Sequence, residues 1–202
     1  AAVGWFVDQA IEIIRLPRLA AGAHEIVLSR PFGPLSNLEW CYVLGDFGVV
    51  VRGRQARIVA PVRALAFGDW TSQGLPFYAG NVTYHCTVAG DGAHLAVQIP
   101  AFKAPLLAVT LNGQSAGKIA FAPFQLALGA LPTGAHTLDI TCYGNRVNTF
   151  GALHNANART SWFGPSAWRT AGVEWSYAYQ LRAMGILTAP RMLTIPVAEM
   201  LP

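Results

Sequence analysis

Short runs of alternating apolar residues, each ended by Gly, Pro or Asn, recur along this chain of 202 residues. The run 95–99 stops at Pro100, and the run 107–111 stops at Asn112-Gly113. An Asn-Gly pair after a strand favours a two-residue hairpin, because both central residues need positive φ. Strands this short and evenly spaced predict an all-β sandwich. Helix is expected only as a turn near residues 1–9 or 123–128, since 20 Gly and 13 Pro break the chain often.

The composition excludes several kinds of partner. Apolar residues make up 53% of the chain, but no run approaches the roughly 18 uninterrupted apolar residues of a membrane-spanning helix. The net charge is +4, and no basic run gives the footprint of a nucleic-acid-binding protein. We therefore expect neither a membrane nor a nucleic acid as partner.

The three cysteines, Cys41, Cys86 and Cys142, are far apart and odd in number. A buried free thiol behaves as a small hydrophobic group, which favours free thiols here over a disulfide. No Cys-x-x-Cys pair occurs, so a structural zinc site is not expected.

One segment of the chain occurs twice as an internal repeat, which we call the echo. Residues 19–28 match residues 131–140 in a Leu, a Gly-Ala-His and the alternating aliphatic positions, and residues 92–95 form a weaker copy. A Gly-containing turn that feeds a strand explains this pattern better than a cluster of metal-binding histidines. The echo predicts two related β-layers, over 1–66 and 67–190, with 191–202 as a C-terminal tail.

The run 67–84, FGDWTSQGLPFYAGNVTY, carries a family resemblance. Its Trp, Gly, Pro, Tyr and Gly come in the order that resembles the entry into galactose-binding-like jelly-roll β-sandwiches of large glycoside hydrolases, of the family-2-like and α-L-rhamnosidase-like kinds. The hairpin at Asn112-Gly113, the strand at 134–140 and the Asn-rich loop 145–155 follow in the family's order. The resemblance implies a C-terminal fragment of such a protein, with the upstream domains of the same polypeptide as partners. Residues 1–66 look like the back part of a preceding sandwich.

The resemblance implies a non-catalytic domain that binds carbohydrate or shapes a catalytic cleft. Sugar recognition uses flat aromatic faces for the C–H side of the ring and amides or guanidinium groups for the hydroxyls. Loop residues of these kinds are the candidate carbohydrate-binding set: Trp70, Tyr78, Arg146, Asn148, His154, Asn155, Trp162 and Trp168. Core packing of the rings, and hydrogen bonds within a long loop, are the competing interpretations.

Two other functions stay open. The chain could be a purely structural interdomain sandwich that buries Trp5 and Trp40 against missing domains. It could also be a small glycosidase, since Asp69 and Glu174 each lie beside an aromatic residue and a glycosidase needs two carboxylates. No cofactor is expected, although sandwiches of this family often hold one structural calcium ion.

Overall fold

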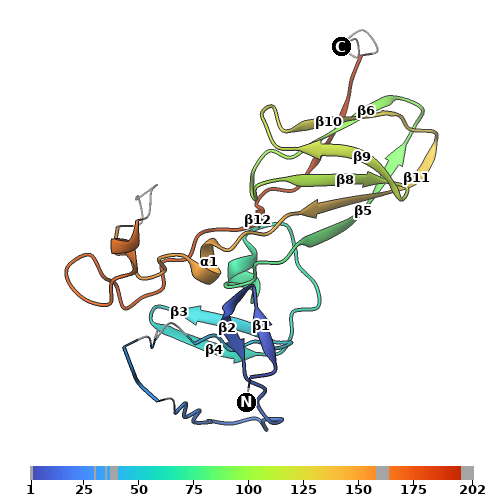
Figure 1. Ribbon diagram of the computed structural model, residues 1–202. Helices are drawn as coiled ribbons and strands as arrows, with labels where there is room; N and C mark the ends of the chain where they lie inside the picture. The colour runs from blue at the N-terminus through green and yellow to red at the C-terminus, as the bar shows by residue number, and fades with distance from the viewer. Residues whose placement is uncertain (1, 30, 35, 37–40, 158–163, 197–202) are drawn as a thin grey trace. The chain divides into compact units, whose positions relative to one another are not determined.

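The computed structural model describes residues 2–29, 31–34, 36, 41–157 and 164–196 of the chain. Apart from three short helical turns, the regular structure of these residues is antiparallel β-sheet, which confirms the predicted all-β fold (Figure 1). The chain divides into two compact units, Ala1–Val43 and Leu44–Pro202. Each unit is described by itself.

The first unit contains one hairpin, formed by β1 (Gly4–Phe6) and β2 (Asp8–Ile13). None of the residues that the structure describes in this unit is buried, and Phe32 is 78% exposed. Residues 25–29, whose alternating apolar side chains are typical of a strand, pair with no strand in the described part of the chain. The first unit therefore has no hydrophobic core of its own in the described part.

The second unit begins with the hairpin of β3 (Gly48–Arg52) and β4 (Gln55–Val59). Gly53 stands in its turn with a φ of 57°, a left-handed conformation that glycine adopts without strain. The amide of Val49 donates to the carbonyl of Gly74 (2.8 Å), directly after the 3-10 turn η1 (Trp70–Gln73). This hydrogen bond joins the hairpin to the chain that follows it. The compact units divide between residues 43 and 44. The predicted boundary between two β-layers at residue 66 stays a prediction.

Two sheets form the sandwich of the second unit. The larger sheet has the strand order β5-β11-β8-β9, and the smaller has the order β10-β6-β13, while β7 pairs with β12. The larger sheet comprises β5 (Val82–Gly90), β8 (Leu107–Leu111), β9 (Gln114–Ile119) and β11 (Gly134–Cys142). The others are β6 (His94–Gln98), β7 (Phe102–Lys103), β10 (Gln125–Ala130), β12 (Gly185–Ile186) and β13 (Arg191–Thr194).

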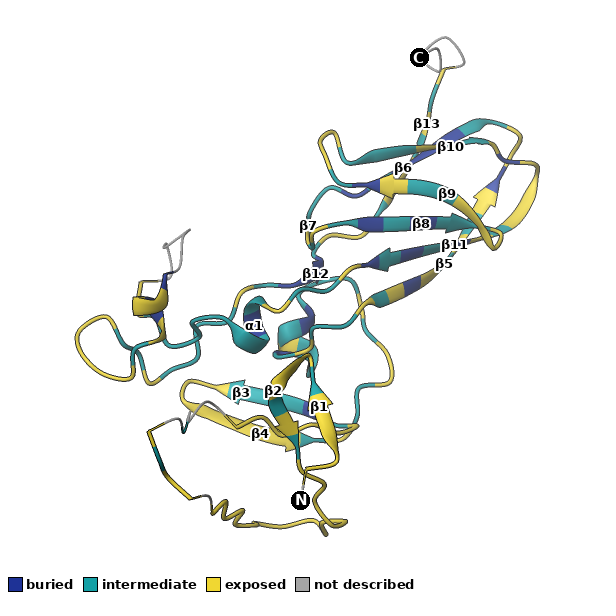
Figure 2. Ribbon diagram, viewed as in Figure 1, coloured by how far each residue is buried: buried dark blue, intermediate teal, exposed yellow. Residues whose placement is uncertain are grey.

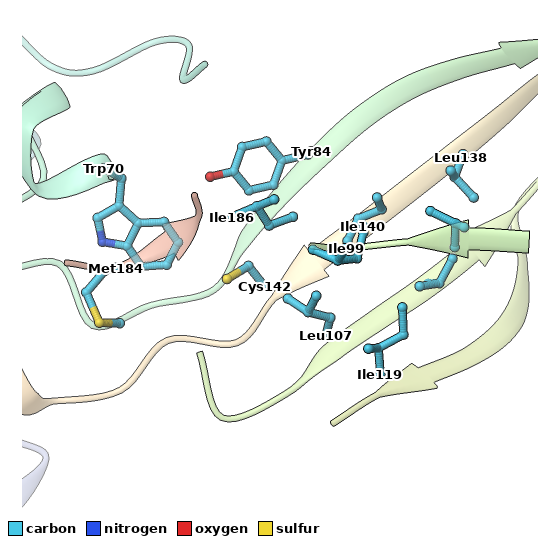
Figure 3. Close-up of a cluster of buried hydrophobic side chains, with 12 residues drawn as sticks. Trp70, Tyr84, Ile99, Leu107, Ile119, Leu138, Ile140, Cys142, Met184 and Ile186 are labelled. Atoms are coloured by element: carbon cyan, nitrogen blue, oxygen red, sulfur yellow. The ribbon is translucent and has the colours of Figure 1, made fainter. Parts of the chain in front are cut away.

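The core lies on one face of the larger sheet. Alternate residues of β11, namely Leu138, Ile140 and Cys142, are buried, whereas the residues between them are half-buried or exposed, so the strand shows period-two burial (Figure 2). Val97 of β6 belongs to the same cluster, with other buried side chains shown in Figure 3. Burial raises the pKa of the Cys142 thiol to about 12, because the thiolate loses its water. Cys41, Cys86 and Cys142 are free thiols, but only Cys142 is buried as a small hydrophobic group, whereas Cys86 is half-buried and Cys41 is exposed.

Several details differ from the sequence-based expectations. The residues near 123–128, expected to form a helical turn, belong largely to β10, and the region of residues 1–9 holds β1 and the start of β2. Pairing with β6 places residues 125–130 in a sheet, where the cross-strand neighbours and not the local sequence determine the conformation. The predicted tail contains β13, which pairs with β6 over four residues. The Asn112-Gly113 hairpin is confirmed, with φ values of 50° and 78° between β8 and β9.

The sequence echo corresponds to a shared hydrogen bond. Nε2 of His136 donates to the carbonyl of Pro132 (2.8 Å), and Nε2 of His24 donates to the carbonyl of Ala20 (2.7 Å), four residues earlier in both cases. The histidine therefore closes the turn in each copy. This confirms that the Gly-Ala-His pattern marks a turn.

Candidate functional site

After β11 the chain leaves the sandwich and returns to it only at β12. We call the described part of this excursion, residues 144–157 and 164–184, the aromatic arm; it is drawn in yellow-orange and orange in Figure 1. The amide of Gly144 donates to Oδ1 of Asn81 (3.2 Å) at its base. A Cβ atom at Gly144 would collide with the carbonyl oxygens of Ala79 and Gly80, so this close approach requires glycine. The base of the arm is thus held by the loop before β5.

Backbone hydrogen bonds join the two halves of the arm. The amide of Ser176 donates to the carbonyl of His154 (2.7 Å), and the amide of Gln180 donates to the carbonyl of Leu153 (2.6 Å). The amide of Ala156 donates to the carbonyl of Glu174 (2.8 Å). These bonds run antiparallel, and an isolated antiparallel bridge joins Asn155 and Trp175. The long loop is therefore ordered by its own backbone.

A row of aromatic rings follows the same segment. The Tyr179 ring lies 5.4 Å from the Phe77 ring and 4.8 Å from the His154 ring, measured between centroids. Trp175 lies 5.6 Å from His154 on one side and 4.1 Å from Tyr177 on the other. Tyr177, at the outer end, is 68% exposed. The row gives the arm a packed base and an aromatic outer end.

Trp168 presents the second exposed aromatic surface of the arm. It ends the 3-10 turn η2 (Pro165–Trp168), and its indole Nε1 donates to the carbonyl of Phe150 (3.0 Å) at the end of the helix α1 (Val147–Phe150). The side chain is 41% exposed, so one hydrogen bond fixes the ring while much of its surface stays in water. Such a fixed, amphipathic ring suits contact with a ligand that has both apolar and polar faces.

Beside Trp168 lies a hollow of about 40 Å³. This volume is close to that of one or two water molecules and far below the several hundred Å³ of a small-molecule pocket. The hollow is therefore too small to enclose a ring the size of a sugar. The hollow is lined by Val147, Gly151, Ala152, Leu153, Trp168, Gln180 and Arg182.

Two members of the candidate carbohydrate-binding set are structural residues, and their prediction as ligand-facing side chains is wrong. Trp70 is completely buried in the core, where Tyr78 meets it edge-on at 6.4 Å. Asn148 is 2% exposed, and its amide is used twice: Nδ2 donates to the carbonyl of Arg182 (2.7 Å), and Oδ1 accepts from the Arg182 amide (2.9 Å). The Trp70 ring packs in the core, and the Asn148 amide hydrogen-bonds within the arm, so both side chains have structural roles.

The remaining candidates lie on or beside the arm. Tyr78 is exposed, with its hydroxyl donating to the carbonyl of Asn81 (3.3 Å), and Arg146 is exposed at the start of α1. His154 and Asn155 are half-buried; Nδ1 of His154 donates to the carbonyl of Ser176 (2.9 Å). Trp168 is the exposed ring described above, and Trp162 lies outside the described residues.

Three further residues of the arm, namely Tyr177, Gln180 and Arg182, were not among the candidate residues. Trp175, Tyr177 and Tyr179 have period-two spacing, which is typical of a strand whose alternate side chains face a core. Backbone contacts between residues that are 18 to 27 positions apart in the chain pair this segment with residues 153–156. The one local signal that this segment is not a core strand is the charged Arg182 at the end of its polar and aromatic residues.

The possible catalytic pair has other roles. Oδ1 of Asp69 accepts from the amides of Thr71 (2.9 Å) and Met184 (3.1 Å), and Oδ2 accepts from the Thr71 hydroxyl (2.8 Å). Asp69 thereby caps η1 and ties it to the chain just before β12. Glu174 is bound by the guanidinium group of Arg169. Both carboxylates are accounted for by structural contacts.

In the residues that the structure describes, no group of three or more His, Cys, Asp or Glu side chains is arranged to hold a metal ion. Calcium also binds through backbone carbonyls, so the structural calcium ion that the resemblance implies stays a prediction. Within the same residues, no helix has the length and hydropathy needed to cross a bilayer.

Comparison with known proteins gives fold-level likenesses only. No protein-family model and no curated protein matches the chain. A rhamnosidase from Novosphingobium sp. PP1Y matches with 20% identity and a TM-score of 0.41, over 72% of this chain and 14% of that one. A GH2 β-galacturonidase from Eisenbergiella tayi, solved with glycerol and with galacturonate, matches with 22% identity and a TM-score of 0.35. These matches cover 58% of this chain and 20% and 21% of those chains.

The chain therefore spans about a fifth or less of the length of these solved structures. They are glycoside hydrolases, the class that the sequence motifs resemble. The likeness is partial and concerns the fold.

Proposed function

We propose that the chain is a non-catalytic accessory domain of a glycoside-hydrolase-like protein, and that its aromatic arm binds carbohydrate or shapes a neighbouring cleft. The observation that carries the proposal is Trp168, an exposed indole whose Nε1 is fixed by the carbonyl of Phe150. A ring held in one orientation loses little further conformational entropy when a sugar packs on it. The polar side chains of Gln180 and Arg182 beside the hollow would serve the sugar hydroxyls.

The arm is a better candidate than the outer face of the larger sheet. That face carries small polar side chains that bond one another across strands: Thr83 with Thr141 (2.9 Å) and His85 with Asp139 (2.8 Å). It resembles the solvated face of an antiparallel sheet. The exposed rings of the arm have no counterpart among these residues.

A catalytic role is not proposed, because Asp69 and Glu174 are engaged in the contacts described above. A glycosidase needs one carboxyl group that can donate a proton and a second that is available to the sugar or to water. Asp69 accepts three hydrogen bonds from its own surroundings. The Asp69 carboxylate is therefore placed as the N-cap of η1.

The second candidate function is a structural interdomain module, and one observation favours it. The described part of the first unit has large apolar side chains in water, among them Trp5, Val27 and Phe32, and no buried residue. Extended apolar surfaces of this kind are typical of protein interfaces. The two functions are compatible, since they use different parts of the chain.

Titration of the chain with oligosaccharides by isothermal calorimetry tests the proposal. We expect binding at millimolar saccharide or below, weakened about tenfold, or about 1.4 kcal/mol, by Trp168→Ala. Trp5→Ala, which removes an exposed indole from the first unit, is the matched control and leaves the affinity unchanged. Absence of binding to every saccharide tested, or equal losses in the two variants, would leave only the structural function.

A further inference from the structure

We infer that two copies of this chain associate through β5, an end strand of the larger sheet. The two β5 strands would run antiparallel about a two-fold axis, and the two larger sheets would become one continuous sheet. This inference concerns the sandwich of the second unit. It goes beyond the proposed function and does not depend on it.

The free edge of β5 is long and regular. β5 is the last strand on one side of its sheet (Figure 1), and over the described part of the chain it pairs only with β11. This pairing covers all nine residues of β5, from Val82 to Gly90, without a register shift. Since backbone groups alternate between the two sides of a strand, about every second residue of β5 directs its N–H and C=O groups away from β11. Such an edge is a template for a further strand.

The other end strands of the two sheets carry features that oppose pairing. β9 contains Lys118 and has a register shift against β8, and β10 has a register shift against β6. β13 has only four residues, begins with Arg191 and lies between Pro190 and Pro196. Charged side chains, prolines, irregular pairing and short length are the means by which proteins protect sheet edges. β5 contains no Lys, Arg, Asp, Glu or Pro, so it is the unprotected one of these four strands.

The exposed side chains of β5 lean away from its free edge. The Thr83 hydroxyl bonds the Thr141 hydroxyl of β11 (2.9 Å). Nδ1 of His85 lies 2.8 Å from Oδ1 of Asp139, also on β11. Each bond draws a β5 side chain toward β11, so the backbone groups on the other side of β5 are left uncovered.

A second copy of β5 matches this edge in length and in charge. In antiparallel pairing, the register that pairs all nine residues places Cys86 opposite its own copy. On the exposed face, Thr83 then lies opposite Ala89 of the second copy. His85 lies opposite Thr87 of the second copy, so no like charges face each other. Because two-fold dimers are the commonest soluble oligomers, we assign the edge to a second copy of the chain.

Sedimentation velocity of the full chain tests the association. The average mass should rise from that of a monomer toward that of a dimer as the concentration increases from about 5 to about 500 μM. Thr83→Glu/Ala89→Glu should weaken association at least about tenfold, because carboxylates then face each other across the axis. Gln114→Glu/Ser115→Glu is the matched control: it adds the same charge at exposed positions of β9 and should leave association unchanged.

A charge exchange distinguishes repulsion at the interface from damage to the fold. Thr83→Lys/Ala89→Lys should also weaken association at least about tenfold. An equimolar mixture of the lysine and glutamate variants should form a heterodimer, since opposite charges then lie across the axis. This recovery requires that both variants keep the β5 edge intact.

Cross-linking with a short bismaleimide tests the register. The background is Cys41→Ser/Cys86→Ser, in which the remaining thiol is buried. Thr87→Cys should give a covalent dimer, because its two copies lie about 10 Å apart in the proposed register. Thr83→Cys should give little, because an offset of six residues at about 3.3 Å each separates its two copies by about 20 Å.

Three results would overturn the inference. They are a monomer at every concentration, a dimer that persists in both charge variants, and cross-linking through Thr83→Cys as efficient as through Thr87→Cys. None of them affects the proposed function, which calorimetry with oligosaccharides tests separately.

Discussion

Replacement of Asn148 by alanine should loosen the aromatic arm, because the Asn148 side chain joins the two halves of the arm. The Asn148 amide makes two hydrogen bonds to the backbone of Arg182, at 2.7 and 2.9 Å, in an environment that leaves the side chain 2% exposed. Each hydrogen bond contributes about 0.5–1.5 kcal/mol, and a buried partner left unsatisfied costs about 1–3 kcal/mol. Water that enters the vacated space would recover part of this cost. We therefore expect Asn148→Ala to destabilise the arm by about 2–4 kcal/mol.

Hydrogen exchange measured by mass spectrometry resolves this effect by region. The amides of residues 174–182 should exchange faster by about 30-fold or more, since each 1.4 kcal/mol is a factor of ten, whereas the amides of β11 should keep their protection. Asn155→Ala is the matched control: Asn155 is half-buried, and Oδ1 accepts the nearby amide of Asn157 (3.0 Å). Its expected effect is below about 1 kcal/mol. Equal acceleration in the two variants, or uniform acceleration that includes β11, would refute the assigned role of Asn148.

Two further predictions concern stability. Burial raises the pKa of the Cys142 thiol from 9.0 to about 12, so its contribution to the free energy of unfolding should be complete below pH 9 and be lost as the pH rises from about 9 to 12. Urea unfolding should show this loss in the parent chain and in Cys41→Ser, but much less of it in Cys142→Val. An equal pH dependence of the three chains would contradict the assignment. Removal of residues 1–43 should change the melting temperature of the second unit by less than about 3 °C, as followed by circular dichroism, because the described part of the first unit has no buried residue; a fall of 10 °C or more would contradict this.

Local sequence was sufficient where the determinants of structure are local. The Asn112-Gly113 turn has the positive φ values that its residue types favour, and Leu138 and Ile140 face the core as the alternation of β11 predicts. The turns closed by His24 and His136 recur because the same few residues recur. In each case the neighbours in sequence are also the neighbours in space.

The incorrect predictions involve distant contacts. Trp70 stands among Gly and Pro residues, which are typical of an exposed loop, but Asp69 binds the amide of Met184, 115 residues later, and η1 is thereby packed into the core. Asn148 is polar and lies in a loop, yet it is buried by its bonds to Arg182, 34 residues away. Neither partner is visible from the local pattern. For the exposed site residues that remain, above all Trp168, the sequence predicts the residue types of a binding loop but not which side chains lie together on one surface.

NMR can show whether carbohydrate binds on the aromatic arm, because the chain has six tryptophans and the indole N–H signal of each in a ¹⁵N–¹H spectrum is a separate reporter. On titration with an oligosaccharide that binds in calorimetry, the Trp168 signal should shift with saturation, while the signals of buried Trp70 and of Trp5 in the first unit stay in place. A saturating shift of Trp5 with an unchanged Trp168, or no shift of any indole at millimolar saccharide, would contradict it.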